Sequence, residues 1–452
     1  MSTGAARAGR PAPFVSGSIM RHVIVMTLTG ALGLMALFAV DLVDLLFLSM
    51  LNQTAVTAAI GYAGTVVFTN LSVAIGCGIA AAALVARNVG AGDMTRAREY
   101  ATSALLFSLI MAGAITIAIN LGSGALLSLL GAQGEAKHLA QLFIWTMTPG
   151  YILISGAICC SFILRGLGDA RRAMYITLSA ALVTACMDPI FIFGFGWGIQ
   201  GAAAATVVGY IISFGIGLHG VAKVHGFLNP MRLSGLKRDF PALWAIALPA
   251  ILTQIATPFA NAYMTHEIAP FGDEAVAGFA IVGRVIPVAF GIIFALAGSV
   301  GPIIGQNYGA KRHDRVLKTL TDGLLFSAVY TLATSLVLFI FRHHIAEAFN
   351  AAGRTVDIVV FFCTFIGISW AFAGAQFVAN AAFNNLGRAK LSTWFNWGKA
   401  TLGTIPFALV GARLGGPEGI LAGTALGSVI FGIASVVTAY RIVRRSEAGA
   451  SI

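Results

Sequence analysis

Residues 85–108, VARNVGAGDMTRAREYATSALLFS, return in altered form as residues 304–327, IGQNYGAKRHDRVLKTLTDGLLFS. The two stretches align without a gap at an offset of 219 residues. In each of them a short basic turn separates two apolar runs. A stretch that returns at the same place in a second half predicts a chain built from two related halves.

Apolar runs of about 20 residues, long enough for a helix to cross a bilayer, fill both halves. The 452 residues are 58% hydrophobic and 10% charged, against about 25% charged in a soluble domain. We therefore predict an all-α integral membrane protein with twelve transmembrane helices, in two parallel six-helix repeats around a central cleft. The expected parts are cytoplasmic tails at 1–18 and 442–452, an N-lobe at 19–222, a cytoplasmic linker at 223–240 and a C-lobe at 241–441.

The basic residues follow a topological pattern. Most of the 28 Lys and Arg residues lie in the two tails and in every second loop. The positive-inside rule then predicts a multi-pass protein of the plasma (inner) membrane with both termini in the cytoplasm. This topology explains the net charge of +11, so we expect the lipid bilayer, and no nucleic acid, as a partner. Residues 1–18 lack the apolar core of a cleaved signal, and the first helix is expected to be an uncleaved anchor.

Three acids fall inside the predicted spans. Asp41 and Asp44 lie three residues apart in the first span, on one face of a helix. Asp188 lies in the fifth span, and counting from the basic loops puts Asp44 and Asp188 in the outer half of the membrane, at the level of Thr206 in the sixth. The second half has no acid at the matching positions, which are Asn261, Met264 and Ile405. This asymmetry indicates that the acids serve coupling and not folding.

Two carboxylates close together in a site of low dielectric cannot both be ionised cheaply. Such a pair can take up a proton on one side of the membrane and release it on the other, or hold Na⁺ together with hydroxyl and carbonyl oxygens. Protonation would remove a charge and let the cavity collapse, which would displace a bound substrate. The alternative is that Asp44, Asp188 or, above all, Asp41 is a packed acid with a hydrogen-bond partner.

Four more residues are candidates for the cavity or a gate. Lys399 in the eleventh span and Arg284 in the eighth either line the cavity and balance a carboxylate, or extend to the interface or bond a helix end. His266, near the outer end of the seventh span, fits either an outer gate or a solvated rim. Gln254 of the same span completes this set.

Seven short motifs over nearly the whole chain resemble those of the multidrug and toxic compound extrusion (MATE) family of secondary transporters. They are DLLFL (44–48), LRGLGDAR (164–171), DPIFIFG (188–194), GIQGAAAAT (198–206), LP (248–249), GDEAVA (272–277) and GQNYGA (305–310). The resemblance implies export of drugs or metabolites by rocking of two lobes, driven by inward flow of H⁺ or Na⁺.

The resemblance also implies a cation site in the first lobe. The family's carboxylates match Asp44 and Asp188, and its hydroxyl in the sixth span matches Thr206. Thr184 stands where the family has Asn, which shortens one oxygen ligand and favours H⁺ over Na⁺. The position near Thr257, acidic in one branch of the family, is not acidic here, so no site is expected in the second lobe. No metal is expected beyond Na⁺ at Asp44, Asp188 and Thr206.

We therefore predict a secondary active multidrug efflux transporter that exports organic cationic or neutral compounds against inward H⁺ by alternating access. The alternatives are a Na⁺-coupled version of this exporter and a lipid-linked oligosaccharide flippase. No nucleophile motif, phosphate loop or metal cluster lies at a shared depth, so we expect no enzyme and no cofactor. The expected partners are small-molecule drugs or metabolites, and the protein is expected to function as a monomer.

Overall fold

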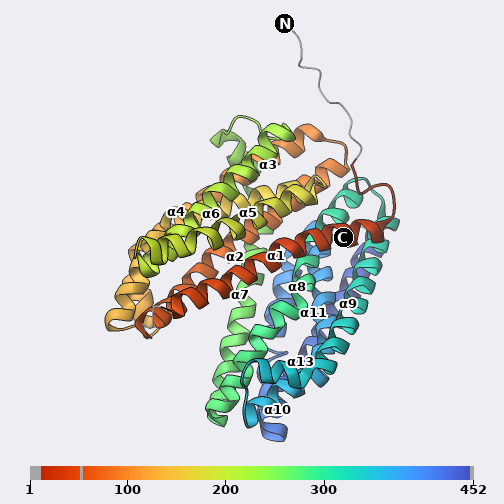
Figure 1. Ribbon diagram of the computed structural model, residues 1–452. Helices are drawn as coiled ribbons and strands as arrows, with labels where there is room; N and C mark the ends of the chain where they lie inside the picture. The colour runs from red at the N-terminus through yellow and green to blue at the C-terminus, as the bar shows by residue number, and fades with distance from the viewer. Residues whose placement is uncertain (1–11, 51–53, 448–452) are drawn as a thin grey trace.

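The computed structural model describes residues 12–50 and 54–447, and helices make up nearly all of this part (Figure 1). The N-terminal half holds α1 (Ile19–Ser49), α2 (Thr54–Gly90), α3 (Met94–Leu129), α4 (Gly134–Gly166), α5 (Ala170–Pro189), η1 (Ile190–Gly194), α6 (Gly198–His219) and η2 (Gly220–Val224). The C-terminal half holds α7 (Leu233–Ile268), η3 (Ala269–Phe271), α8 (Asp273–Gly309), α9 (His313–Ala348), α10 (Arg354–Phe361), η4 (Phe362–Ile366), η5 (Gly367–Ser369), α11 (Trp370–Asn385), α12 (Ala389–Ala400) and α13 (Ile405–Glu447).

These helices form two lobes, an N-lobe of α1–α6 and a C-lobe of α7–α13 (Figure 1). Within the N-lobe α2 packs on α4, α4 on α6 and α1 on α5, and within the C-lobe α8 packs on α9 and α11. Helices α1 and α2 also pack against α7 and α8 of the other lobe. The all-helical architecture in two halves confirms the prediction from the repeat.

The prediction of twelve spans is confirmed by a hairpin near the C-terminus. Eleven segments of the described chain are long and apolar enough to cross a membrane, and the last runs over Ala389–Glu447. This segment contains two spans, because the backbone leaves the helical region at Gly415 and Gly416 (φ +58°), directly before Pro417. Beyond this turn α13 lies against its own first part, with Gly411 and Gly419 in backbone contact. A reversal of the chain at two glycines therefore separates spans eleven and twelve.

The lobes meet at one end of the molecule, which we call the joined end. Here Gly90 of α2 lies against the carbonyl of Gln306 in α8, and Gly309 of α8 lies against the carbonyl of Arg87 in α2. A Cβ at either glycine would overlap the opposing carbonyl oxygen, so only glycine permits this approach. The contact closes the space between the lobes at this end.

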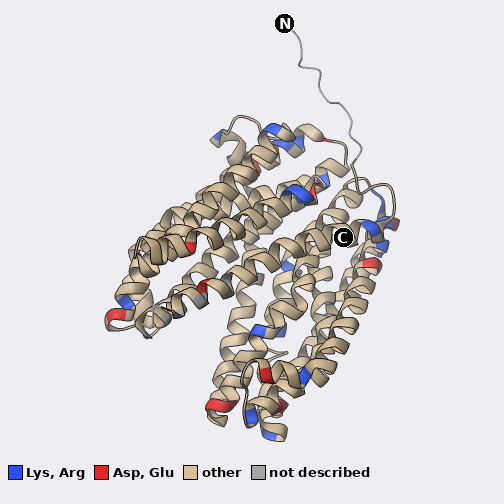
Figure 2. Cartoon of the chain, in the orientation of Figure 1, with Lys and Arg blue, Asp and Glu red and all other residues tan. Residues whose placement is uncertain are grey.

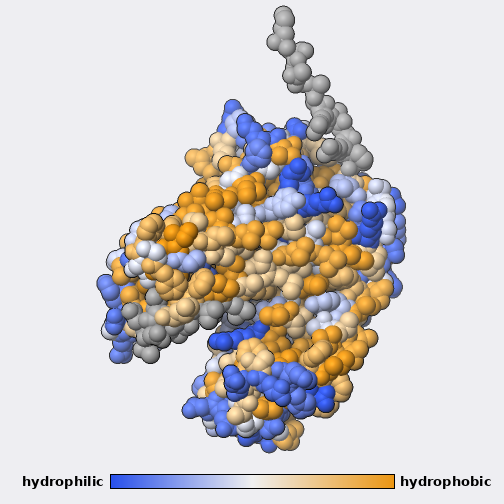
Figure 3. Space-filling model, in the orientation of Figure 1, coloured by the Kyte–Doolittle hydropathy of each residue, from blue (hydrophilic) through white to orange (hydrophobic). Residues whose placement is uncertain are grey.

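At the opposite, open end the two lobes diverge, and the space-filling view shows a hollow between them (Figure 3). Much of the lobe surface is apolar, as expected for a surface that faces lipid (Figure 3). Lys and Arg residues gather along the joined end (Figure 2). The fold thus encloses a cleft that is open at one end and closed at the other.

Candidate functional site

The carboxyl groups of Asp44 and Asp188 meet inside the N-lobe. Asp44 lies near the end of α1 and is half-buried, and Asp188 in α5 has no exposed surface. The two side chains are close enough to interact with each other, and Asp44 is the only charged group near Asp188 in the described part of the chain. The structure therefore brings together the two acids that the sequence paired.

These acids lack the hydrogen bonds that buried carboxylates usually accept. Apart from each other, the two carboxyl groups have few partners: neither oxygen of Asp188, nor Oδ1 of Asp44, has a hydrogen bond to any other described residue. A buried carboxylate without a donor or counter-charge is costly, so the arrangement is stable only when a proton or a cation is shared there. The pair is thus suited to binding and releasing a cation.

Close packing of α1 on α5 positions this pair. Gly33 of α1 lies so near the Thr177 hydroxyl of α5 that a Cβ would overlap it. On the far side of Asp188, Pro189 ends the regular α-helix and a π-helical segment, Ile190–Gly194, follows. Proline removes a backbone hydrogen-bond donor, and a π-helical turn interrupts the regular i→i−4 hydrogen bonds of the α-helix. The helix is therefore locally distorted beside the acid.

The two threonines of the predicted site lie on α5 and α6. Thr184 is buried one turn before Asp188, and its Oγ1 lies 2.6 Å from where a Cβ on Gly209 of α6 would stand. The hydroxyl of half-buried Thr206 donates to the carbonyl of Ala202 at 3.0 Å, which leaves its oxygen lone pairs free to accept. The side chain of Asp41 lies outside the described residues.

The four predicted cavity or gate residues lie on helices α7, α8 and α12 of the C-lobe. Arg284 is exposed on α8 and lies seven residues before Gly291, on the side of the open end. Gly291 itself faces Met35 and Phe38 of α1. A kink at Phe290 (φ −113°) separates the two positions, so the helical period does not carry the facing direction of Gly291 over to Arg284. Lys399 is half-buried in the last turn of α12, and no ion pair of the described residues includes either cation. On α7, Gln254 is half-buried and His266 is exposed near the end of the helix.

No metal centre is present in the part of the chain that the structure describes. There, no group of three or more His, Cys, Asp or Glu side chains could hold a metal ion. A sodium site at Asp44, Asp188 and Thr206 stays a prediction, because a hard cation needs several oxygen ligands around it. A proton needs only the carboxyl pair.

One buried cation at the junction of the lobes was not singled out by the sequence. Arg165, at the end of α4, is 8% exposed, and one guanidinium nitrogen lies 2.9 Å from where a Cβ on Gly298 of α8 would stand. Gly30 of α1 lies on another side of the same group. In the sequence Arg165 is one of the loop charges and part of the motif LRGLGDAR, and neither feature predicts its burial. Its position between three helices depends on how the lobes pack, which hydropathy does not report.

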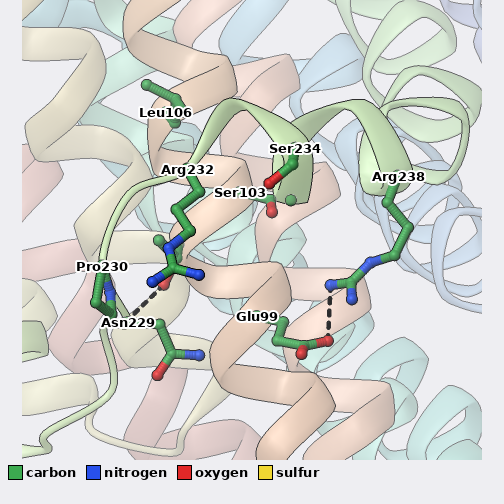
Figure 4. Close-up of a pocket in the computed structure, with 10 residues that line it drawn as sticks. Glu99, Ser103, Leu106, Asn229, Pro230, Arg232, Ser234 and Arg238 are labelled. Carbon is green, nitrogen blue, oxygen red and sulfur yellow. Dashed lines mark hydrogen bonds and ion pairs between the residues drawn. The ribbon is translucent and has the colours of Figure 1, made fainter.

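A second missed feature is a pocket of about 520 Å³ at the joined end, between α3 and the chain that leads into α7 (Figure 4). Arg238 donates to Glu99 at 2.7 Å on one wall, and the backbone of Asn229 donates to Thr102 at 2.9 Å (Figure 4). Beneath it Asp239 is fully buried and accepts from several partners. The basic segment 223–240 is therefore fastened to α3 and is more than a loose linker.

An all-helical membrane protein whose two related lobes part around a cleft, with an isolated acid pair inside one lobe, has the architecture of an alternating-access carrier. The profile of the MatE family matches residues 31–190 and 249–410. The chain therefore belongs to the MatE family of transporters.

Known proteins resemble the chain over most of its length. A relative in Shewanella oneidensis, named an FAD transporter, is 27% identical over 434 residues, which cover 95% of this chain and 96% of the relative. The probable multidrug resistance protein NorM of Thermotoga maritima is 23% identical over 340 residues, covering 73% of this chain and 72% of the relative. The crystal structure of the Vibrio cholerae MATE transporter VcmN in the bent form has a TM-score of 0.89 at 24% identity, over 95% of this chain and 98% of that one.

Proposed function

We propose that the protein is a proton-driven exporter of small organic molecules in the plasma (inner) membrane, with its joined end in the cytoplasm. The observation that carries this proposal is the contact between the carboxyl groups of Asp44 and Asp188, whose buried oxygens have no hydrogen bond to any described residue outside the pair. A site with this composition is most stable when it is occupied by a proton or a cation. The basic loops at the joined end support the orientation.

In the proposed cycle the lobes part at the open end and the acid pair is reached from outside. A proton enters between Asp44 and Asp188, which removes the repulsion between two carboxylates and lets α1 and α5 pack more closely. The cargo then leaves the cleft. The open end closes, the joined end opens, and the proton is released on the cytoplasmic side. The protein works as a monomer in this scheme, because each chain holds both lobes and one complete acid pair.

The cargo is expected to be an organic cation or a neutral compound, because the charges of the N-lobe site are negative. The Shewanella relative is named for a different cargo, FAD, which is an anion. FAD therefore belongs among the compounds to be assayed, together with a cationic dye. A flippase of lipid-linked oligosaccharides is the alternative with a different cargo, and the same assay with a lipid-linked sugar distinguishes it.

The test is export into inside-out vesicles with ΔpH and ΔNa⁺ imposed separately. Wild type is compared with Asp44→Asn and Asp188→Asn, and Asp273→Asn is the control because Asp273 is an exposed acid at the start of α8. We expect export with ΔpH alone, a loss of roughly a hundredfold in both site variants and no change in the control. Unchanged export in both site variants would refute the site, and export driven only by ΔNa⁺ would replace the proton by sodium at Asp44, Asp188 and Thr206.

A further inference from the structure

Residues 12–18, directly before α1, lie across the joined end and touch both lobes. We call this segment the strap. It has no helical structure, yet Ala12 is only 7% exposed and Phe14 only 3%. An apolar side chain that is buried outside any helix indicates that the segment is docked and not merely extended over the surface.

The C-lobe holds the strap with hydrogen bonds to its backbone. The Phe14 N–H donates to Oε1 of Gln306 at 3.0 Å. The Phe14 carbonyl accepts from Nδ2 of Asn307 at 3.1 Å and from Nη2 of Arg315 at 2.9 Å. The same guanidinium nitrogen donates to the carbonyl of Ser16 at 3.1 Å. Because all of these bonds go to the backbone of the strap, they fix its path whatever its side chains are.

The N-lobe holds the strap by apolar packing. Pro13 lies against Gly168, in the turn between α4 and α5, so closely that a Cβ there would overlap the proline ring. Ala12 belongs to the apolar cluster that α2, α3 and α4 build, whereas Phe14 belongs to the cluster that α8, α9 and α11 build. Ala12 is thus buried on the N-lobe side, whereas Phe14 is buried mainly by the C-lobe and its ring also lies against Gly168 of the N-lobe.

One amide side chain links the strap to the seam between the lobes. Gln306 is fully buried, and while its Oε1 accepts from Phe14, its Nε2 donates to the carbonyl of Gly166 in the N-lobe at 2.8 Å. When the joined end opens, the hydrogen bond between Gln306 and Gly166 must break, and the strap must detach from either the N-lobe or the C-lobe. The hydrogen bonds keep it on the C-lobe, so the packing of Ala12 and Pro13 on the N-lobe is the part that is released.

We propose that the strap is a latch that holds the joined end closed and is released each time the lobes open there. This inference rests on the proposed alternating-access function. It adds gating residues, Phe14, Gln306 and Arg315, that lie at the opposite end of α1 from Asp44. Because the strap runs directly into α1, a movement of α1 at the acid pair and a movement of the strap are connected through one helix.

The test measures the distance between spin labels on the two lobes at the joined end. Labels are placed at Arg171 and Lys390, which are exposed and occupy equivalent positions of the two halves, after replacement of the five native cysteines. The strap variants are Phe14→Ala and Arg315→Ala. The protein is studied in lipid nanodiscs without substrate, so the outcome does not depend on which ion or cargo is transported.

We expect one short distance in the wild type and, in both strap variants, a population at longer distance that is roughly tenfold larger than in the wild type. Arg315→Ala removes a charge-assisted hydrogen bond, and Phe14→Ala removes buried apolar packing. The matched controls are Ser16→Ala, which keeps the carbonyl that Arg315 binds, and Arg312→Ala, whose guanidinium contacts Asp314 at the surface. Distributions equal to those of the controls in both strap variants would refute the latch.

A second experiment keeps the proposal testable if a strap variant fails to fold. Cysteines at Ser16 and Arg315 are joined by a short reducible thiol cross-linker, which fixes the strap to the C-lobe and leaves its N-lobe contacts free to part. A second pair, at Pro13 and Asp169, is joined in the same way and fixes the strap to the N-lobe. We expect export to persist with the first link and to stop with the second until reduction, and full export with the second link intact would overturn the proposal.

Discussion

Arg87 and Gln306 cross the seam between the lobes in opposite directions. Nη2 of Arg87 donates to the carbonyl of Asn385 at 2.6 Å, and Nε2 of Gln306 donates to the carbonyl of Gly166 at 2.8 Å. Both pairs of positions, 87 with 306 and 166 with 385, are separated by 219 residues. The joined end is therefore closed by two hydrogen bonds related by the internal symmetry, although one donor is Arg and the other Gln. The same repeat that builds the two lobes also supplies the contacts between them.

Replacing Gly90 or Gly309 by Ala is expected to open the joined end. The added Cβ would overlap a carbonyl oxygen of the opposing helix, so α2 and α8 must separate at this point. Distances between spin labels at Arg171 and Lys390 should lengthen in both variants. The state in which the joined end is closed and the opposite end is open should be less populated.

The control for this experiment is Gly113→Ala in α3. A Cβ at Gly113 meets no atom within 4 Å, so the substitution is expected to leave the distances unchanged and to favour the helix by up to about 1 kcal/mol. Distances in Gly90→Ala and Gly309→Ala that match those of this control would contradict the close approach of α2 and α8.

Two equivalent serines are expected to respond differently to the same substitution. Ser108 and Ser155 share a hydrogen bond of 2.8 Å in the N-lobe. In the C-lobe the equivalent of Ser155 is Gly374, and the hydroxyl of Ser327 has no partner among the described residues. Ser108→Ala should cost about 1 kcal/mol because it removes the bond between the two hydroxyls and leaves Ser155 only the backbone carbonyl of residue 108, whereas Ser327→Ala should be neutral or slightly stabilising. Thermal unfolding in detergent measures both, and equal losses would contradict the assignment.

Comparing two fully buried acids, Asp188 and Asp239, tests whether the Asp44–Asp188 pair serves transport or the stability of the fold. Asp188 has no hydrogen-bond partner among the described residues other than the Asp44 carboxyl, whereas Asp239 accepts from Ser103 at 2.6 Å and pairs with Arg96 at 2.8 Å. Asp188→Asn should therefore keep or raise the melting temperature while it abolishes export, because an amide can donate to Asp44. Asp239→Asn should lower stability by about 2 kcal/mol. A large loss of stability in Asp188→Asn would show that its carboxylate is part of the fold.

Asp169, in the turn between α4 and α5, is expected to give a pH-dependent stability. Partial burial by itself raises the pKa of this carboxyl, but hydrogen bonds from His225 and Arg172 outweigh it and hold the pKa well below its usual range. Its contribution is therefore complete above the unfolded pKa of about 3.9 and is lost as the pH falls through the lower folded value. The gap in melting temperature between wild type and Asp169→Asn should narrow below about pH 4. A gap that stays constant from pH 6 to pH 3 would contradict this.

The sequence was sufficient for the number of spans and for the pairing of Asp44 with Asp188. Apolar length reports how often a chain crosses a bilayer, and an acid in such a run is conspicuous because its burial is costly. The depth of each acid followed from its distance to the basic loops. The hydrogen-bonding state of the pair did not follow, because it depends on every neighbouring side chain. The roles proposed for Lys399, Arg284, His266 and Gln254 stay predictions.

Hydropathy and the repeat by themselves determined that two related helical lobes exist and that one of them contains acids, since both properties depend on the order of apolar and polar residues along the chain. The tertiary structure alone decided that Gly90 meets Gln306, that Arg165 is buried between three helices, and that Phe14 is docked between the lobes. These contacts depend on the crossing and register of helices far apart in the chain. A difference of one residue in register turns a helical side chain by about 100° and removes such a contact, and hydropathy is too coarse to record it.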